Sequence, residues 1–123
     1  MDNNLFQQAA DTAWEKLPEK FKSMISNTII VIEDYPDEEI VRNMHLRSKH
    51  QLLGLYQGVP LNHRLTSYGM YAVTPDKISL YQKNIESVCR TDSEIEQKVL
   101  EVMVHEIGHH FGMTEQELHD AGF

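Results

Sequence analysis

The strongest constraint on the fold is the segment of residues 91–112, TDSEIEQKVLEVMVHEIGHHFG, which has the pattern of one long amphipathic helix. Its apolar residues recur every three or four positions: Ile95, Val99, Met103, Ile107 and Phe111, with Leu100 and Val104 beside them. A stripe this wide predicts a helix that is buried on one side against a hydrophobic core. Thr91 and Glu94 have the spacing of a capping box, which places the helix start near Asp92. Gly112 can end the helix in a left-handed conformation.

The same helix carries the sequence His105-Glu106-Ile107-Gly108-His109, which is H-E-x-x-H. Histidines four residues apart lie one turn apart on one helix face, so both imidazoles can reach a single zinc ion. Glu106 lies beside such an ion without having to bind it, and a carboxylate there can accept a proton from water that the metal activates. The alternative is a chance arrangement on a polar helix face, with Glu106 paired to His110 and no metal.

A third metal ligand is expected just beyond the helix. Thr114 and Glu117 have capping-box spacing, so a short helix is predicted directly after the turn at Gly112. This turn brings Glu115 back toward the histidine face, and a carboxylate oxygen is a suitable zinc ligand. Three protein ligands leave one position for water, as in catalytic zinc sites. His119 is the alternative third ligand, and the helix dipole alone also favours an acid at position 115.

The rest of the chain predicts a small α+β fold. Residues 5–17 have helical spacing of apolar side chains, which indicates an N-terminal amphipathic helix. Three apolar or β-branched segments predict strands: residues 28–32, 52–57 and 77–81. The second and third strands are expected to pair antiparallel across residues 62–73, which show no clear period. We therefore expect a mixed or antiparallel sheet of about three to four strands, packed against the N-terminal helix and the histidine-bearing helix.

Several other residues near these elements carry weaker signals. His110 points away from the other two histidines of its helix and is expected to pack or to interact with the negative end of the helix. Glu101 lies one turn before His105. It is expected either to hydrogen-bond a metal ligand or to be a solvated surface residue. Tyr68 and Tyr71 could donate a hydrogen bond to the oxyanion of a hydrolytic intermediate. Glycine costs a helix about 1 kcal/mol relative to alanine, so Gly108 is expected to serve close packing against the sheet.

Composition limits the classes of protein that this chain can belong to. Its 123 residues favour a single domain, 1–123, and the net charge of −8 argues against nucleic-acid binding. No apolar run approaches the roughly 20 residues of a membrane span, and the N-terminus lacks the pattern of a signal peptide. Cys89 is the only cysteine, so it cannot form an intrachain disulfide, and a buried reduced thiol is expected. A cytoplasmic location follows as an expectation.

The motif and its surroundings resemble a known family. H-E-x-x-H-x-x-G-x-x followed by a ligand resembles the metzincin-type extension of the zincin signature, in which the third ligand is histidine. More specifically, the chain resembles the small bacterial minimal zincin family of metallopeptidases over nearly its whole length. The segments that carry this resemblance are the Leu-Pro-Glu sequence at Leu17, the strand before Glu33-Asp34, LLGLYQGVPL, TPDKISLYQ and HEIGHHFGMT.

The resemblance implies a zincin-like fold, with a few helices on a small sheet. It also implies zinc at His105, His109 and position 115, with Glu106 as general base. The third ligand of that family is usually Asp, so Glu115 departs from the pattern by one methylene group.

Three functions are compatible with these observations. The first is a zinc-dependent peptidase that cleaves a peptide or protein substrate, with the strand at residues 52–57 pairing with the extended substrate. The second is a metal-binding module for an unknown protein partner, with little proteolysis. Its motive is size, because without a second subdomain below the metal site the substrate pockets would be shallow unless a partner completes them. The third is a metal-dependent RNA hydrolase, which the negative charge and the glutamate after the first histidine both oppose.

Overall fold

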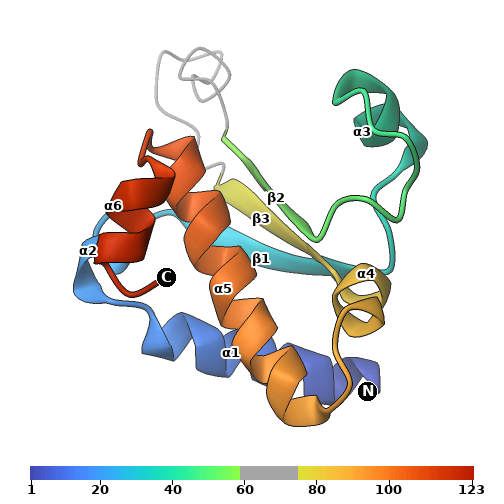
Figure 1. Cartoon of the computed structure of the whole chain (residues 1–123), viewed down its shortest axis with the longest axis horizontal. Helices are drawn as coiled ribbons and strands as arrows, with labels where there is room; N and C mark the ends of the chain where they lie inside the picture. Colours follow the sequence, from blue (N-terminus) through green and yellow to red (C-terminus); the bar gives the residue numbers. More distant parts are fainter. Residues whose placement is uncertain (59–74) are drawn as a thin grey trace, which may run out of the picture.

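The computed structural model describes residues 1–58 and 75–123. The elements in chain order are α1 (Asn3–Lys16), α2 (Glu19–Lys22), β1 (Thr28–Glu33), α3 (Glu38–Asn43), β2 (Gly54–Gln57), β3 (Asp76–Tyr81), α4 (Gln82–Ser87), α5 (Asp92–His110) and α6 (Glu115–Asp120). Figure 1 shows α5 crossing one face of the sheet. α1 runs across the N-terminal half of α5, and α6 lies beside its C-terminal half. The α+β prediction is therefore confirmed.

The sheet of the described residues is mixed, with the strand order β1-β3-β2. β1 is parallel to β3, with Thr28 opposite Asp76. β2 is antiparallel to β3, as the sequence predicts, with Gly54 opposite Leu80. β1 and β2 are thus the two edge strands, and the central strand β3 is buried from Ile78 to Tyr81.

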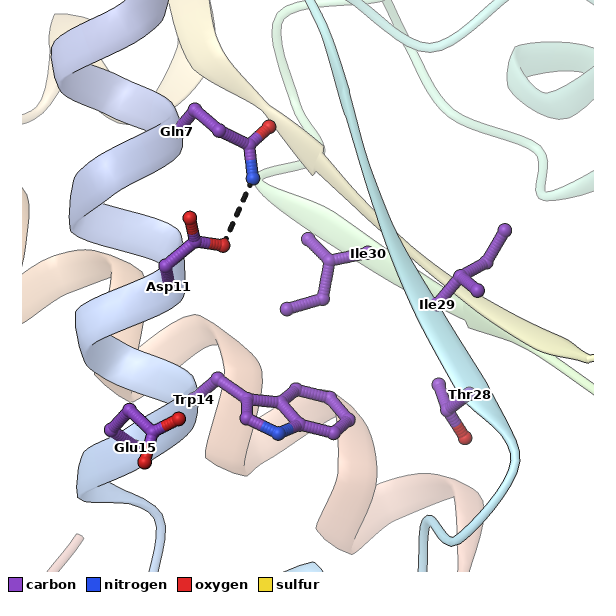
Figure 2. Close-up of a pocket in the computed structure, with 7 residues that line it drawn as sticks. All are labelled: Gln7, Asp11, Trp14, Glu15, Thr28, Ile29 and Ile30. Atoms are coloured by element: carbon purple, nitrogen blue, oxygen red, sulfur yellow. Dashed lines mark hydrogen bonds between the residues drawn. The ribbon is translucent and has the colours of Figure 1, made fainter.

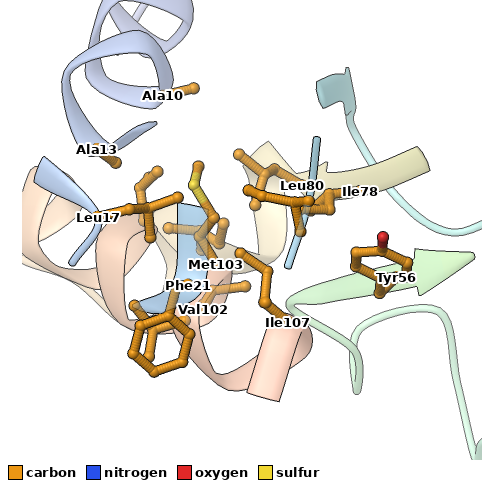
Figure 3. Packing of buried hydrophobic residues seen from close by; sticks show 14 of the residues in the cluster. Ala10, Ala13, Leu17, Phe21, Tyr56, Ile78, Leu80, Val102, Met103 and Ile107 are labelled. Carbon is orange, nitrogen blue, oxygen red and sulfur yellow. The ribbon is translucent and has the colours of Figure 1, made fainter. Parts of the chain in front are cut away.

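The hydrophobic core lies between the sheet and the layer formed by α1 and α5. Alternate residues of the strands point toward the helices, because side chains of a strand alternate between its two faces. The small buried side chains of Ala9, Ala10 and Ala13 on α1 let its backbone approach α5 closely. Figure 3 shows the central part of this packing: Ala10, Ala13, Leu17, Phe21, Tyr56, Ile78, Leu80, Val102, Met103 and Ile107.

The helix ends confirm some predicted details and correct others. The Thr91 hydroxyl accepts a hydrogen bond of 3.1 Å from the Glu94 N–H, so α5 begins at Asp92 as predicted. The Glu94 carboxylate, however, accepts from the N–H of Arg90, so only half of the predicted capping box forms. Phe111 is 43% exposed although it was expected on the buried stripe, because α5 ends there.

Gly54 has a packing role in β2. A Cβ atom there would lie 2.6 Å from Cγ1 of Val102 and 3.0 Å from the carbonyl oxygen of Ser79. A side chain of α5 and the backbone of the neighbouring strand therefore both come too close for any residue larger than glycine.

Three further predictions have different outcomes. Cys89 is only partly buried, although a buried thiol was expected. Tyr68 and Tyr71 lie outside the described residues, as does the predicted unpatterned segment 62–73. Among the described residues, no helix has the length and apolar character needed to cross a membrane.

Candidate metal centre

The C-terminal end of α5 is a glycine turn. Gly112 has φ of +81°, which is favourable only for a residue without a side chain. Its N–H donates to the carbonyl of His109 (3.1 Å), and the N–H of Met113 donates to the carbonyl of Gly108 (2.8 Å). This pair of bonds is the Schellman motif, which satisfies the last carbonyls of the helix and reverses the chain.

α6 begins immediately after this turn and packs against α5. The Thr114 hydroxyl accepts from the Glu117 N–H (3.1 Å), and the Glu117 carboxylate accepts from the Thr114 N–H (3.3 Å). The second predicted capping box is therefore confirmed in full. A Cβ atom at Gly108 would lie 2.6 Å from Cδ2 of the buried Leu118. The prediction that Gly108 packs against the sheet is wrong, since it makes room for α6.

The two helices and the turn bring His105, His109 and Glu115 together. One potential ligand atom of each residue lies within 4.8 Å of the others. The Nε2 atom of His109 is 2.6 Å from Oε1 of Glu115, and Nδ1 of His105 is 3.9 Å from Oε2 of the same carboxylate. Imidazole nitrogens with one carboxylate oxygen are the donor set of many catalytic zinc sites, so these residues fit the metal that the sequence predicts.

This cluster opens toward solvent. The side chains of His105, His109 and Glu115 are 31%, 48% and 72% exposed. A structural zinc site is usually closed by four protein ligands, whereas a catalytic site keeps one position accessible. Within the described residues, the exposure and the three donors match the open arrangement.

Glu106 lies beside the cluster and is held by β2. Burial raises the pKa of its carboxyl above the ordinary value, while His109, the backbone N–H of Tyr56 and His105 act in the opposite direction. The N–H of Tyr81 donates to the carbonyl of Leu53, so the odd-numbered residues of β2 exchange bonds with β3. The N–H of Tyr56 therefore points away from β3, to the outer edge of β2, where it donates to Glu106.

His105 has a second partner in the last residue of the chain. Its Nε2 atom is 3.3 Å from the backbone oxygen of Phe123. The Phe123 ring meets Phe21 edge-on, with 6.1 Å between ring centroids. The Phe123 ring is thus anchored against the core, and this places the backbone oxygen of Phe123 beside His105. The contact favours one orientation of the His105 imidazole.

The remaining candidate residues lie around the cluster. The ring of His110 stacks on that of Tyr56, with 4.0 Å between centroids, which confirms that it packs. Glu101 forms an ion pair with Lys98 (3.0 Å). A cavity of about 310 Å³ adjoins the histidine face and is lined by Leu53, Lys98, Glu101, Val102, His105 and Glu106. His119 is exposed and lies outside the three-residue cluster.

Two features of this centre were missed by the sequence analysis. Tyr56 belongs to a predicted strand, but nothing in its pattern indicates that its N–H meets Glu106. Phe123 is a single aromatic residue after a glycine, which carries no local signal of a contact with His105. Both contacts join segments that are far apart in the chain, so only register and packing could have revealed them.

Comparisons with known proteins bear on the family and the fold of this chain. The family model of the zincin-like metallopeptidases matches residues 25–123, which include all four residues of the centre. No curated protein sequence gives a significant match. Among solved structures, the fold is similar to that of a conserved hypothetical protein from Thermus thermophilus, with a TM-score of 0.58 and 24% identity. That match covers 89% of this chain and 94% of the other. With the family match spanning most of its length, this chain belongs to the zincin-like metallopeptidase family.

Proposed function

We propose that this chain is a zinc-dependent peptidase whose single domain, 1–123, hydrolyses peptide bonds. The observation that carries the proposal is the cluster of His105, His109 and Glu115, with the carboxylate of Glu106 next to it but outside the donor set. These three residues would hold the ion. Zinc bound there would polarise a substrate carbonyl and lower the pKa of water.

The protein's own contribution to the chemistry centres on Glu106. Its carboxylate accepts a proton from the attacking water and then passes that proton to the leaving amine. The hydrogen bond from the Tyr56 N–H orients this carboxylate toward the cavity that adjoins the histidines. Phe123 orients His105, so both groups are prearranged before a substrate binds.

In the part of the chain that the structure describes, no strand pairs with the outer edge of β2, which supports a peptide as the substrate class. The N–H and carbonyl of Gly54 point away from β3, by the same alternation that places the Tyr56 N–H at this edge. An extended peptide can pair with such an edge, and the pockets beside it then select its side chains. Leu53 and Val102 give the adjoining cavity an apolar wall.

The test is the Glu106→Gln variant, compared with the wild type for zinc content and for hydrolysis of a broad peptide library read by mass spectrometry. We expect normal zinc content and turnover lowered by about 10²–10⁴-fold, because the amide keeps the shape but cannot accept the proton. Glu101→Gln is the matched control, since it changes a glutamate one turn away that is paired with Lys98.

Zinc-loaded wild type that cleaves no member of the library would contradict the peptidase proposal and favour the metal-binding interaction module. Equal turnover of the Glu106→Gln variant and the wild type would remove Glu106 from the mechanism. RNA hydrolysis has no supporting observation among the described residues, and the net charge of −8 opposes it.

A further inference from the structure

A second concave surface lies at the opposite edge of the sheet from the metal centre. It is a groove of about 450 Å³ between α1 and β1. Figure 2 shows α1 as one wall and β1 as the other. The lining residues are Gln7, Asp11, Trp14 and Glu15 from α1, and Thr28, Ile29 and Ile30 from β1. α5 and α6, which carry the candidate metal centre, are not part of this groove.

β1 is an edge strand without the usual protection. Its sequence TIIVIE has five β-branched residues in succession and reaches a charge only at Glu33. Natural edge strands usually carry lysine, proline or a bulge, which prevent pairing with another chain. β1 has none of these, and within residues 1–58 and 75–123 it pairs with β3 on one side only.

The register identifies the backbone groups on the free side of β1. The N–H of Asp76 donates to the carbonyl of Asn27, so odd-numbered residues of β1 face β3 in this parallel pair. The N–H and carbonyl groups of Thr28, Ile30 and Ile32 therefore point outward. Among the described residues, no hydrogen bond reaches these groups from outside the sheet.

The two faces of a strand added at this edge would meet different surroundings. On the α1 side, its side chains would face the acids Asp11 and Glu15 and the indole of Trp14. An arginine or lysine suits both acids and an aromatic face. On the opposite side, alternate side chains would lie next to Ile29, which is 48% exposed. That face favours apolar residues.

We propose that the groove between α1 and β1 docks an extended segment of a partner protein, in which basic and apolar residues alternate, by strand addition to β1. Charge complementarity selects this occupant over a second copy of the chain. Two copies would bring the acids of both grooves together, and each chain carries a net charge of −8.

The probe is a synthetic peptide of alternating arginine and valine, labelled with a fluorophore and titrated with the full chain. We expect saturable binding, together with slower amide hydrogen exchange at Ile30 and Ile32. The Asp11→Lys/Glu15→Lys variant changes two exposed residues and should bind at least roughly tenfold more weakly. The matched control is Glu38→Lys/Glu39→Lys, which makes the same charge change on α3 and should keep most of the affinity.

A peptide of the same composition with its backbone nitrogens methylated at alternate residues separates strand addition from plain charge attraction. It should lose binding, because it cannot donate hydrogen bonds to the edge. The proposal is overturned if the methylated peptide binds as well as the first, or if both charge-reversal variants weaken binding equally. Concentration-dependent dimers that protect the β1 amides without peptide would also overturn it and assign the edge to a second copy.

Discussion

At the scale of single residues, the proposed centre depends most on Glu115. The spacing along α5 alone places the two histidines on one face, whereas Glu115 reaches them only because the chain turns between α5 and α6. Its carboxylate contacts His109 at 2.6 Å and lies 3.9 Å from His105, while its side chain is 72% exposed. A carboxylate that is held by two imidazoles rather than by the core is placed where a metal ion could bind all three groups.

Replacement of Glu115 by alanine is therefore expected to weaken zinc affinity by more than about 100-fold. Loss of a group that merely orients a ligand already weakens binding by about 10–100-fold, and Glu115 is proposed to bind directly. Competition with a chromophoric chelator measures the affinity. Gln116→Ala is the control, because it alters the next residue of α6, whose amide donates to Asp120. Unchanged affinity in the Glu115→Ala variant would argue against ligation there and make His119 the next residue to replace.

At the scale of elements, the centre is formed by α5, the glycine turn and α6 acting as one unit. The Schellman bonds set the direction of the turn, and the capping box sets the start of α6. Gly108 then determines how closely α6 approaches, since Leu118 fills the space where a side chain would lie. The position of Glu115 thus follows from a packing contact that is remote from the metal face.

The Gly108→Ala variant tests this coupling. Alanine favours a helix by about 1 kcal/mol, but overpacking against the buried Leu118 costs about 1–3 kcal/mol. We expect a net loss of roughly 1 kcal/mol in the free energy of unfolding, measured by urea titration, together with weaker zinc binding. The Gly108→Ala/Leu118→Val variant removes a methylene and should recover both properties. A single variant that is more stable than the wild type, with normal zinc affinity, would show that Leu118 rearranges freely.

At the scale of the whole molecule, the central strand carries polar groups into the interior. Tyr81 is fully buried at the end of β3, and among the described residues neither its hydroxyl nor that of Ser79 has a hydrogen-bond partner of standard geometry. Burial raises the pKa of Tyr81 to about 12. The Ser79 hydroxyl opposes this rise, and the acids Glu33, Asp37 and Glu106 add to it. Because this pKa is raised, the free energy of unfolding is expected to decrease at alkaline pH.

The sign of this dependence follows from proton linkage. An unfolded tyrosine ionises near pH 10, whereas folded Tyr81 stays neutral until about pH 12. Its contribution is therefore fully present below pH 10 and is lost as pH rises toward 12, by about 1.4 kcal/mol at pH 11. Urea titrations should show that the free energy of unfolding decreases less between pH 9 and pH 11 for the Tyr81→Phe variant than for the wild type. Equal decreases would mean that Tyr81 ionises in the folded state as readily as in the unfolded chain.

The sequence by itself determined the features that arise from neighbouring residues. The caps at Thr91 and Thr114, the turn at Gly112 and the spacing of the two histidines all depend on groups within a few positions of one another. Local backbone geometry is enough to predict these features. The position of Glu115 near the two histidines was predictable for the same reason, because the turn and the cap together specify where α6 begins.

Only the tertiary structure decided the features that join distant segments. The parallel pairing of β1 with β3, the Tyr56 N–H on Glu106, the Phe123 oxygen beside His105 and the contact between Gly108 and Leu118 have no signature in local spacing. Each of them depends on strand register or on the approach of two packed helices. These are set by how the whole core fills its volume, whereas periodicity reports only which face of an element is buried.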